Sequence, residues 1–297
     1  MKRFFSSLSP TARGICCILL SALGFALMNV FVKLAGDLPS VQKAFFRNVV
    51  AAVVAGWMLW RSKLPTRYWQ RPNLPLLILR ASLGTAGLLC NYYAVDHLIL
   101  SDASIINKLT PFFVIIFSAL FLRERADHIQ KLGVAAAFCG CLFIVHPSLD
   151  FSAVFPSIIG LLGACFSGAA YTCVRGLTQR GEPGAAIVLF FSLFSCLAVL
   201  PWIAFHYVPM TLEQLGILIL AGCAASVGQF GVTAAYGFAP AKEISVFDYS
   251  QVLFSAVLGF FIFDQLPDGW SLVGYVIIIG TAVLLFRHNL RQTGTAQ

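Results

Sequence analysis

An ionisable side chain interrupts a long apolar segment near residue 108. The stretch 101-SDASIINKLTPFFVIIFSALFLRER-125 places Lys108 beside the amide of Asn107, and Pro111 follows a few residues later. An ammonium group binds carboxylates, an amide both donates and accepts hydrogen bonds, and proline leaves a backbone carbonyl without its helical partner. These residue types together predict a polar site for a small charged molecule, provided that the segment lies in an apolar environment.

The composition of the chain places that segment in a membrane. Of the 297 residues, 59% are hydrophobic and 11% are charged, and the mean hydropathy is +0.86. Soluble domains carry about 25% charged residues, and a bilayer core needs roughly 20 apolar residues per helix. We therefore predict an all-α polytopic membrane protein with ten transmembrane helices, at about 14–34, 41–60, 74–95, 101–122, 131–146, 155–176, 184–205, 213–237, 242–263 and 270–287.

The lysines and arginines set the predicted orientation. With a cytoplasmic N-terminus, most of the 20 basic residues fall in cytoplasmic segments, and only Lys33 and Lys43 fall outside. Basic residues favour the cytoplasmic side, so residues 1–11 and 288–297 are predicted cytoplasmic tails of a protein in the inner (cytoplasmic) membrane. The net charge of +8 then reflects attraction to membrane lipid rather than to nucleic acid. The cysteines and histidines show no metal-binding spacing, so neither a metal nor a cofactor is expected.

The second half of the chain repeats the first. Spans 6 to 10 align in order on spans 1 to 5 with an offset of 140 to 144 residues, so that 84-GTAGLLCNY-92 meets 228-GQFGVTAAY-236. Because five is odd, the second copy must lie inverted, as in many secondary transporters. We predict two inverted five-helix repeats, residues 12–146 and 155–287. At the offset of 140, Lys108 in span 4 meets Asp248 in span 9, and a two-fold axis would bring these charges together near the bilayer centre.

Other polar residues within the spans are candidates for the same site. Arg47 and Arg80 each lie about six residues inside a span, from which a long side chain can snorkel to the headgroups, so a structural role is as well supported as substrate contact. Lys108 can also snorkel, whereas Asp248 is too short to do so. The predicted substrate-binding residues are Lys108, Asp248, Asn107, Asn91, Tyr92, Tyr236, Gln229, Asn29, Tyr171 and Arg47.

Three short stretches, together with the ten-span repeat, point to a known family. They are 45-FFRN-48, 92-YYAVDHLILSDASIINKLTPFF-113 and 122-LRER-125. With them, nearly the whole chain resembles the drug/metabolite transporter superfamily, EamA type. Gln251 stands where that family often has proline, which predicts a straighter span 9, and Asp264 replaces the usual glutamate. The stretch 249-YSQVLFSAVLGFFIFDQLPD-268 also resembles the S-adenosylmethionine uptake branch.

The resemblance implies alternating access around a cavity lined by spans 1, 3, 4, 6, 8 and 9, with spans 5 and 10 at the periphery. We expect a secondary-active transporter of a small metabolite, and the Lys108 and Asp248 pair favours an amino-acid-like zwitterion. S-adenosylmethionine or an organic cation or drug is the alternative substrate, and proton coupling or exchange is the expected drive. A membrane-embedded enzyme would need clustered catalytic groups and a channel a continuous polar lining, so neither is favoured. A homodimer stays open.

Overall fold

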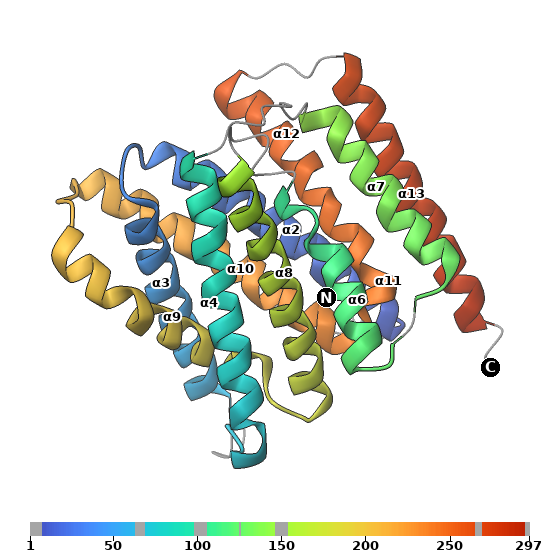
Figure 1. The fold of residues 1–297 in the computed structure, drawn as a ribbon, viewed down its shortest axis with the longest axis horizontal. Coiled ribbons are helices and arrows are strands. Elements are labelled where there is room, and N and C mark those ends of the chain that lie inside the picture. Colours follow the sequence, from blue (N-terminus) through green and yellow to red (C-terminus); the bar gives the residue numbers. More distant parts are fainter. Residues whose placement is uncertain are drawn as a thin grey trace.

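The computed structural model describes residues 8–62, 69–97, 106–124, 126–145, 154–264 and 269–294, without the side chains at 92, 95, 96, 271 and 289–294. These residues form helices joined by short connections (Figure 1). The first repeat contains α2 (Pro10–Leu34), α3 (Ser40–Arg61), the short 3₁₀ helix η1 (Arg71–Asn73), α4 (Leu74–His97), α6 (Thr110–Phe121) and α7 (His128–Val145). The second contains α8 (Val154–Gln179), α9 (Gly184–His206), α10 (Leu212–Phe238), α11 (Ala241–Ile244), η3 (Ser245–Tyr249), α12 (Ser250–Phe263) and α13 (Gly269–Gly294).

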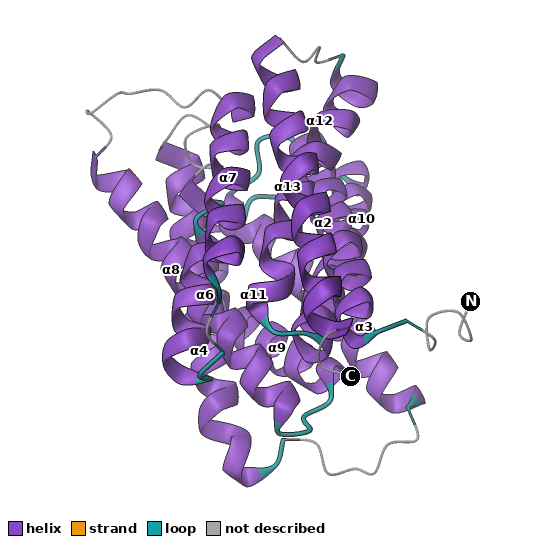
Figure 2. Cartoon of the chain, turned by 90° about the vertical axis from the view of Figure 1, so that its right-hand side faces the viewer, coloured by secondary structure: helices purple, strands orange, loops and turns teal. Residues whose placement is uncertain are grey.

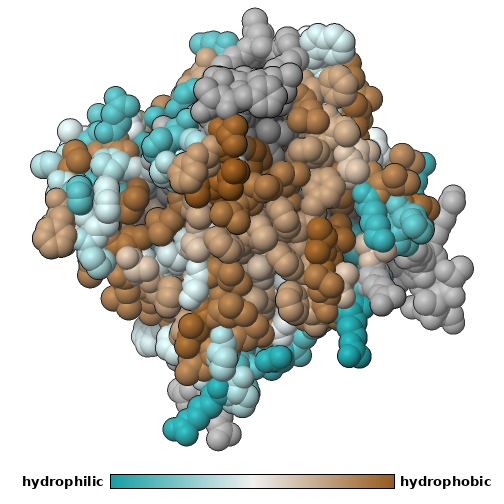
Figure 3. Space-filling model, in the orientation of Figure 1, coloured by the Kyte–Doolittle hydropathy of each residue, from teal (hydrophilic) through white to brown (hydrophobic). Residues whose placement is uncertain are grey.

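The helices have the lengths and surfaces of membrane spans. Six of the described segments are long and apolar enough to cross a bilayer: Pro10–Leu34, Arg71–Asn91, Val154–Gln179, Gly184–His206, Leu212–Phe238 and Ala241–Phe263. Three further apolar helices are shorter, and α3 is more polar because it carries Lys43, Arg47 and Asn48. Figure 3 shows a broad hydrophobic surface with hydrophilic side chains gathered toward the edges. An all-α polytopic membrane protein, as predicted, is confirmed.

The packing of the helices repeats with the two-fold symmetry that the sequence predicts. Helix α2 packs on α10, and the equivalent helix α8 packs on α4; α2 also packs on α12, as α8 does on α6. Helices α3 and α9, which are counterparts, pack on each other, and so do α7 and α13. This exchange of partners is what two inverted five-helix repeats produce around an internal axis. Figures 1 and 2 show α7 and α13 side by side at one edge of the molecule.

Small residues allow the backbones of the central helices to touch. A Cβ atom at Gly24 of α2 would lie 2.6 Å from the backbone nitrogen of Gly228 in α10, and one at Gly163 of α8 would lie 3.2 Å from the carbonyl of Gly87 in α4. Ser21 also donates a hydrogen bond across the first contact, from Oγ to the carbonyl of Gly228 at 2.7 Å. Close approach through small residues and short hydrogen bonds is the usual basis of helix association in lipid.

The two ends of the described chain lie at one face, called here the terminal face. Thr11, at the start of α2, donates to Glu243 of α11 with 2.6 Å between Oγ1 and Oε2. His288, in the last part of α13, lies 2.8 Å from the carboxylate of Asp127, just before α7. Because successive spans reverse direction, the turns at residues 35–39 and 207–211 lie at the other face, called the opposite face.

Spans 4 and 9 are both interrupted. Residues 106 and 107 are helical, residues 108 and 109 form a turn, and α6 begins at Thr110; residues 101–105 of predicted span 4 lie outside the described part of the chain. In span 9 the 3₁₀ helix η3 separates α11 from α12, so the α-helix is interrupted there although Gln251 replaces the proline; the straighter path of span 9 stays a prediction. Ser245 and Ser250 donate their hydroxyls to the carbonyls of Ala241 and Phe247, and such bonds compete with the α-helical ladder without any proline.

Candidate functional site

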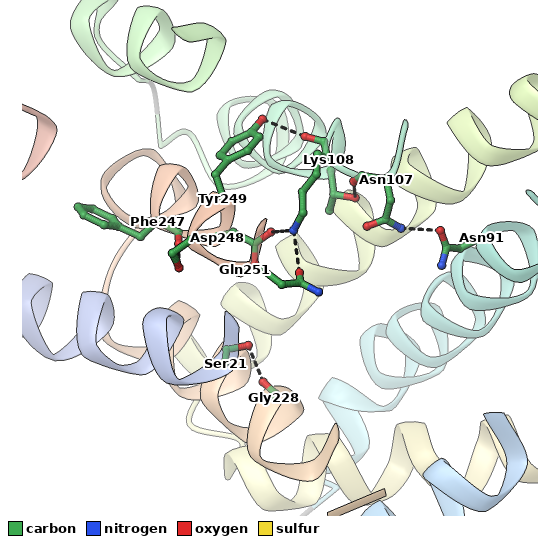
Figure 4. A network of polar contacts seen from close by, with 11 residues as sticks. Ser21, Asn91, Asn107, Lys108, Gly228, Phe247, Asp248, Tyr249 and Gln251 are labelled. Carbon is green, nitrogen blue, oxygen red and sulfur yellow. Dashed lines mark hydrogen bonds and ion pairs between the residues drawn. The ribbon is translucent and has the colours of Figure 1, made fainter. Parts of the chain in front are cut away.

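The two interruptions meet at Lys108, a residue that is 8% exposed. Its Nζ lies 3.3 Å from Oδ2 of Asp248 in η3 and donates a shorter hydrogen bond, 2.7 Å, to Oε1 of Gln251 in α12 (Figure 4). The repeat counterparts Lys108 and Asp248 are therefore in contact. Gln251 was not a predicted site residue, although its replacement of the family's proline was the signal that marked it. The Gln251 amide, which stands in place of a proline ring, gives the Lys108 ammonium a second hydrogen-bond acceptor besides Asp248.

A buried tyrosine holds the two interruptions against each other. Tyr249 is fully buried and its hydroxyl donates to the backbone carbonyl of Lys108 at 2.9 Å (Figure 4). That carbonyl is available because the amide of Phe112 bonds to Leu109 instead. Sequence reasoning missed Tyr249, because its counterpart at the offset of 140 is Leu109 and an apolar helix with one tyrosine carries no distinctive signal.

Pro111 creates a second unpaired carbonyl, on Asn107. The hydroxyl of Thr110 donates to it at 2.7 Å, which satisfies it locally. The side chain of Asn107 in turn donates to the Oδ1 atom of Asn91 in α4, with 2.8 Å between the heavy atoms. The turn at Lys108 is thus tied both to span 9 and to span 3.

A cavity of about 740 Å³ lies beside this network, a volume typical of small-molecule sites. It reaches the opposite face at Gly36, Asp37 and Leu38, and none of the described residues that line it belongs to the segments at the terminal face. Eight of the ten predicted site residues line it: Lys108, Asp248, Asn107, Asn91, Gln229, Asn29, Tyr171 and Arg47. Their assignment to substrate stays a prediction.

The two remaining predicted site residues, Tyr236 and Tyr92, are not among the described residues that line the cavity. Tyr236 does not line the cavity; it is 3% exposed and stacks behind Tyr171, with ring centres 5.6 Å apart. The position of Tyr236 therefore does not support the prediction that it contacts substrate. The repeat alignment gave the place of Tyr236 along its helix, but it did not show which tyrosine ring faces the cavity. The side chain of Tyr92 lies outside the described part of α4.

Arg80 is the largest departure from the sequence-based reading. Its side chain is 2% exposed rather than snorkelling to a headgroup, because α4 packs against α8 and α9 and directs it inward. The guanidinium carbon lies 4.2 Å from the ring centre of Phe191, and Arg80 lines the cavity. Nε and Nη1 have no hydrogen-bond partner among the described residues. Arg47 is likewise 9% exposed, so snorkelling fails for both.

The lining also differs from what the resemblance implies. Spans 1, 3, 4, 6, 8 and 9 do contribute, and the paired helices α7 and α13 contribute none of the described lining residues. However, span 2 supplies Arg47 and span 7 supplies Phe191. These two helices pack on each other across the internal axis, which brings Ser40, Lys43 and Arg47 of α3 and Phe191 of α9 to the cavity.

Ion pairing closes the terminal face. Arg175 of α8 binds Glu124, just after α6, with 2.9 Å between Nη2 and Oε1, and Gln179 donates to the same carboxylate at 3.0 Å. Arg175 also donates to the carbonyls of Tyr236 and Gly237 at the end of α10, at 3.1 and 3.3 Å. This cluster, called here the terminal-face ion pair, joins spans 4, 6 and 8.

Comparison with known proteins decides the family. Residues 12–146 and residues 155–287 each match the EamA-like transporter family. The chain belongs to the EamA-like transporter family. It is a membrane transporter, and the resemblance to the drug/metabolite transporter superfamily is confirmed.

Several relatives of this EamA-like transporter carry specific names. The chain is 31% identical over 276 residues to the pseudopaline exporter CntI of Pseudomonas aeruginosa, covering 92% of this chain and 96% of that protein. It is 27% identical over 280 residues to a riboflavin transporter of Brucella anthropi, covering 92% and 98%. A crystal structure superposes with a TM-score of 0.78 over 93% of this chain and 98% of the other, at 15% identity, and shows the same fold.

Proposed function

We propose that this protein is a secondary-active transporter that moves an amino-acid-like or zwitterionic metabolite by alternating access. The observation that carries the proposal is the cavity, which is open at the opposite face and ends beside the Lys108–Asp248 pair. An ammonium and a carboxylate at the junction of two interrupted helices suit a ligand that has groups of both signs, and transporters place such junctions at their binding sites. The relatives named for pseudopaline and riboflavin support a small-molecule cargo.

Alternating access is supported by the unequal state of the two faces. The repeat counterparts of Arg175 and Glu124 are Lys33 and Asp264 at the opposite face. Both are described and exposed, and no ion pair joins them; the Nζ atom of Lys33 lies 4.3 Å from the ring centre of Phe263 instead. Inverted repeats exchange conformations when the transporter changes state. In the other state, therefore, Lys33 and Asp264 pair while the terminal-face ion pair opens.

We place the protein in the cell membrane with both termini in the cytoplasm, which puts the mouth of the cavity outside. Fluorescence of a C-terminal fusion that folds only in the cytoplasm checks this orientation; a dark fusion overturns it. Membrane lipid and a small substrate are the proposed partners, and transport rather than catalysis is the proposed activity. S-adenosylmethionine, or an organic cation or drug, is the second candidate cargo, favoured by the aromatic lining at Phe25 and Phe191.

The test is thermal unfolding of the purified protein with amino acids, S-adenosylmethionine and organic cations, followed by uptake of each hit into proteoliposomes. We expect a ligand that stabilises the wild type and fails to stabilise Lys108→Ala and Asp248→Asn. The matched control is Lys131→Ala, an exposed lysine at the terminal face. Binding that survives both changes would assign the pair a structural role only. A hit whose uptake does not saturate with concentration would indicate a channel.

A further inference from the structure

Two arginines of the cavity carry charges that the described protein does not neutralise. Arg80 and Arg47 both line the cavity, and each contacts an aromatic ring, Phe191 at 4.2 Å and Phe25 at 5.9 Å. Nε and Nη1 of Arg80 are buried without a hydrogen-bond partner among the described residues. The helices that carry them, α3 and α4, also pack on each other. A buried charge of this kind is costly unless something else pairs with it.

The acidic residues of the cavity lie elsewhere. Among the described lining residues the carboxylates are Asp37 and Asp248. Asp37 is exposed at the mouth, and Asp248 is paired with Lys108. Against these two stand five basic lining residues: Lys33, Lys43, Arg47, Arg80 and Lys108. The lining therefore has an excess of positive charge. Within that excess, Arg47 and Arg80 are the buried residues without a carboxylate partner among the described residues.

The second repeat has no counterpart to the charge of Arg80. At the offset of 144 that aligns span 3 with span 8, its counterpart is Ala224, so the equivalent place in the second repeat is filled without a charge. The chain also makes room for the guanidinium, because a Cβ atom at Gly84 would lie 2.2 Å from Nη1 of Arg80. A glycine one turn away and an aromatic ring on one face hold the guanidinium in a fixed plane. Because Arg80 lines the cavity, its guanidinium is positioned to bind a planar or tetrahedral oxyanion that enters there.

We propose that Arg80, with Arg47, forms an oxyanion-binding subsite at the closed end of the cavity, which receives a carboxylate or phosphate of the substrate. Arg80 lies six residues into α4, about 9 Å along the helix from its start near the terminal face. The subsite rests on the proposed function and narrows its substrate class. A ligand that also engages Asp248 through an amine and Lys108 through an acidic group then carries more acidic groups than amines, so it is a zwitterion with a net negative charge.

Sulfate, inorganic phosphate, glutamate and glutamine are the probes, each titrated at constant ionic strength while the melting temperature of the purified protein is followed. We expect saturable stabilisation by the oxyanions, and stronger stabilisation by glutamate than by glutamine, which lacks the second carboxylate. Arg80→Gln should weaken these affinities at least tenfold, and Arg80→Lys should weaken them less, because the charge stays while the forked geometry is lost. Arg180→Gln, which removes an exposed arginine, is the matched control.

A second readout separates a binding arginine from a structural one. Without any anion, Arg80→Gln should melt at a temperature no lower than the wild type, because an unneutralised buried charge is removed. A lower melting temperature together with unchanged anion affinity would show that Arg80 is structural. Preference for phosphate over glutamate would assign the subsite to a phosphate group, and the reverse to a carboxylate.

The subsite and the proposed function fail in different ways. If none of the four probes stabilises the wild type more than Arg80→Gln, the subsite is wrong, although saturable uptake in proteoliposomes would still support the transporter. If anion binding is lost in Arg80→Gln and no solute is ever carried, the subsite stands and the proposed function is overturned.

Discussion

Arg175 and Glu124 are joined at the terminal face, with 2.9 Å between Nη2 and Oε1, while their repeat counterparts Lys33 and Asp264 at the opposite face are not joined. Equivalent positions of the two repeats are thus paired at one face of the molecule and unpaired at the other. An inverted repeat relates these two conditions, so they are the two arrangements that the proposed alternating access would exchange.

The first prediction concerns this exchange. Arg175→Gln removes the terminal-face ion pair and should shift the protein toward the other state, so that amide hydrogen exchange rises near residues 176–183 and falls near residues 33–38. Asp264→Asn is the matched change at the opposite face. It should leave exchange in the present state unaltered, because Asp264 has no ion-pair partner here. Equal effects of the two variants would show that the faces are not coupled.

Tyr249→Phe is the second prediction. The change leaves the buried carbonyl of Lys108 without the hydroxyl that bonds to it at 2.9 Å, at a cost of about 1–3 kcal/mol in the free energy of unfolding. Binding should weaken as well, because the turn that positions the ammonium loses its anchor. Unfolding in a graded series of denaturing detergent measures the cost. Tyr207→Phe, at a tyrosine that is 52% exposed, should cost nothing measurable; an equal cost at both tyrosines would contradict the assigned role.

The third prediction tests the room around Arg80. Gly84→Ala places a methyl group where Nη1 now lies, 2.2 Å from the new Cβ atom, so the guanidinium must move. We expect weaker binding of sulfate and glutamate although both arginines remain. Gly56→Ala is the control, since no atom lies within 4 Å of its added Cβ, and it should stabilise the helix by about 0.5–1 kcal/mol. Titration of the melting temperature measures both, and unchanged anion binding in Gly84→Ala would show that the guanidinium position does not matter.

Gln251 offers the fourth prediction. It is the second residue of α12, where proline is tolerated, so Gln251→Pro should fold. The variant removes the 2.7 Å acceptor of Lys108, as does Gln251→Ala without any change in backbone preference. If the hydrogen bond from Lys108 to the amide of Gln251 sets how strongly the ammonium binds a ligand, both variants should change ligand affinity several-fold and to the same extent. A change confined to the proline variant would instead assign the role of Gln251 to helix flexibility.

The fold was predictable from sequence because its information is periodic and repeated. The lengths of the apolar segments predicted the spans. The alignment of the two halves, at offsets of 140 to 144 residues, predicted the inverted repeat and therefore the pairing of Lys108 with Asp248. What sequence reasoning missed depends on where a side chain points. Arg80 and Arg47 lie at depths from which either a headgroup or a cavity is in reach, and only the packing of α4 and α3 decides between them. Tyr236 illustrates the same point, because its position in the helix fixed its depth but not that Tyr171 would lie between it and the cavity.

Asymmetric features were the least predictable part of the site. Tyr249 and Gln251 align with Leu109 and Pro111 of the other repeat, so comparison of the halves did not mark either as part of the polar network around Lys108. Ser245 and Ser250 interrupt span 9 through hydroxyl bonds, where the first repeat uses Pro111. The two repeats therefore interrupt equivalent spans through different local bonds, and Pro111 in the first half gave no indication of the serine bonds in the second.

The contact of Gly24 with Gly228, and of Gly87 with Gly163, has a consequence for how the molecule is divided when it moves. Each contact joins a helix of one repeat to a helix of the other at backbone distance, so neither partner can slide without the other. Under the proposed alternating access, α2 with α10 and α4 with α8 should therefore move as the rigid bodies, rather than the two repeats. A chain cut between residues 146 and 155 should be inert as separate halves and active when both are co-expressed.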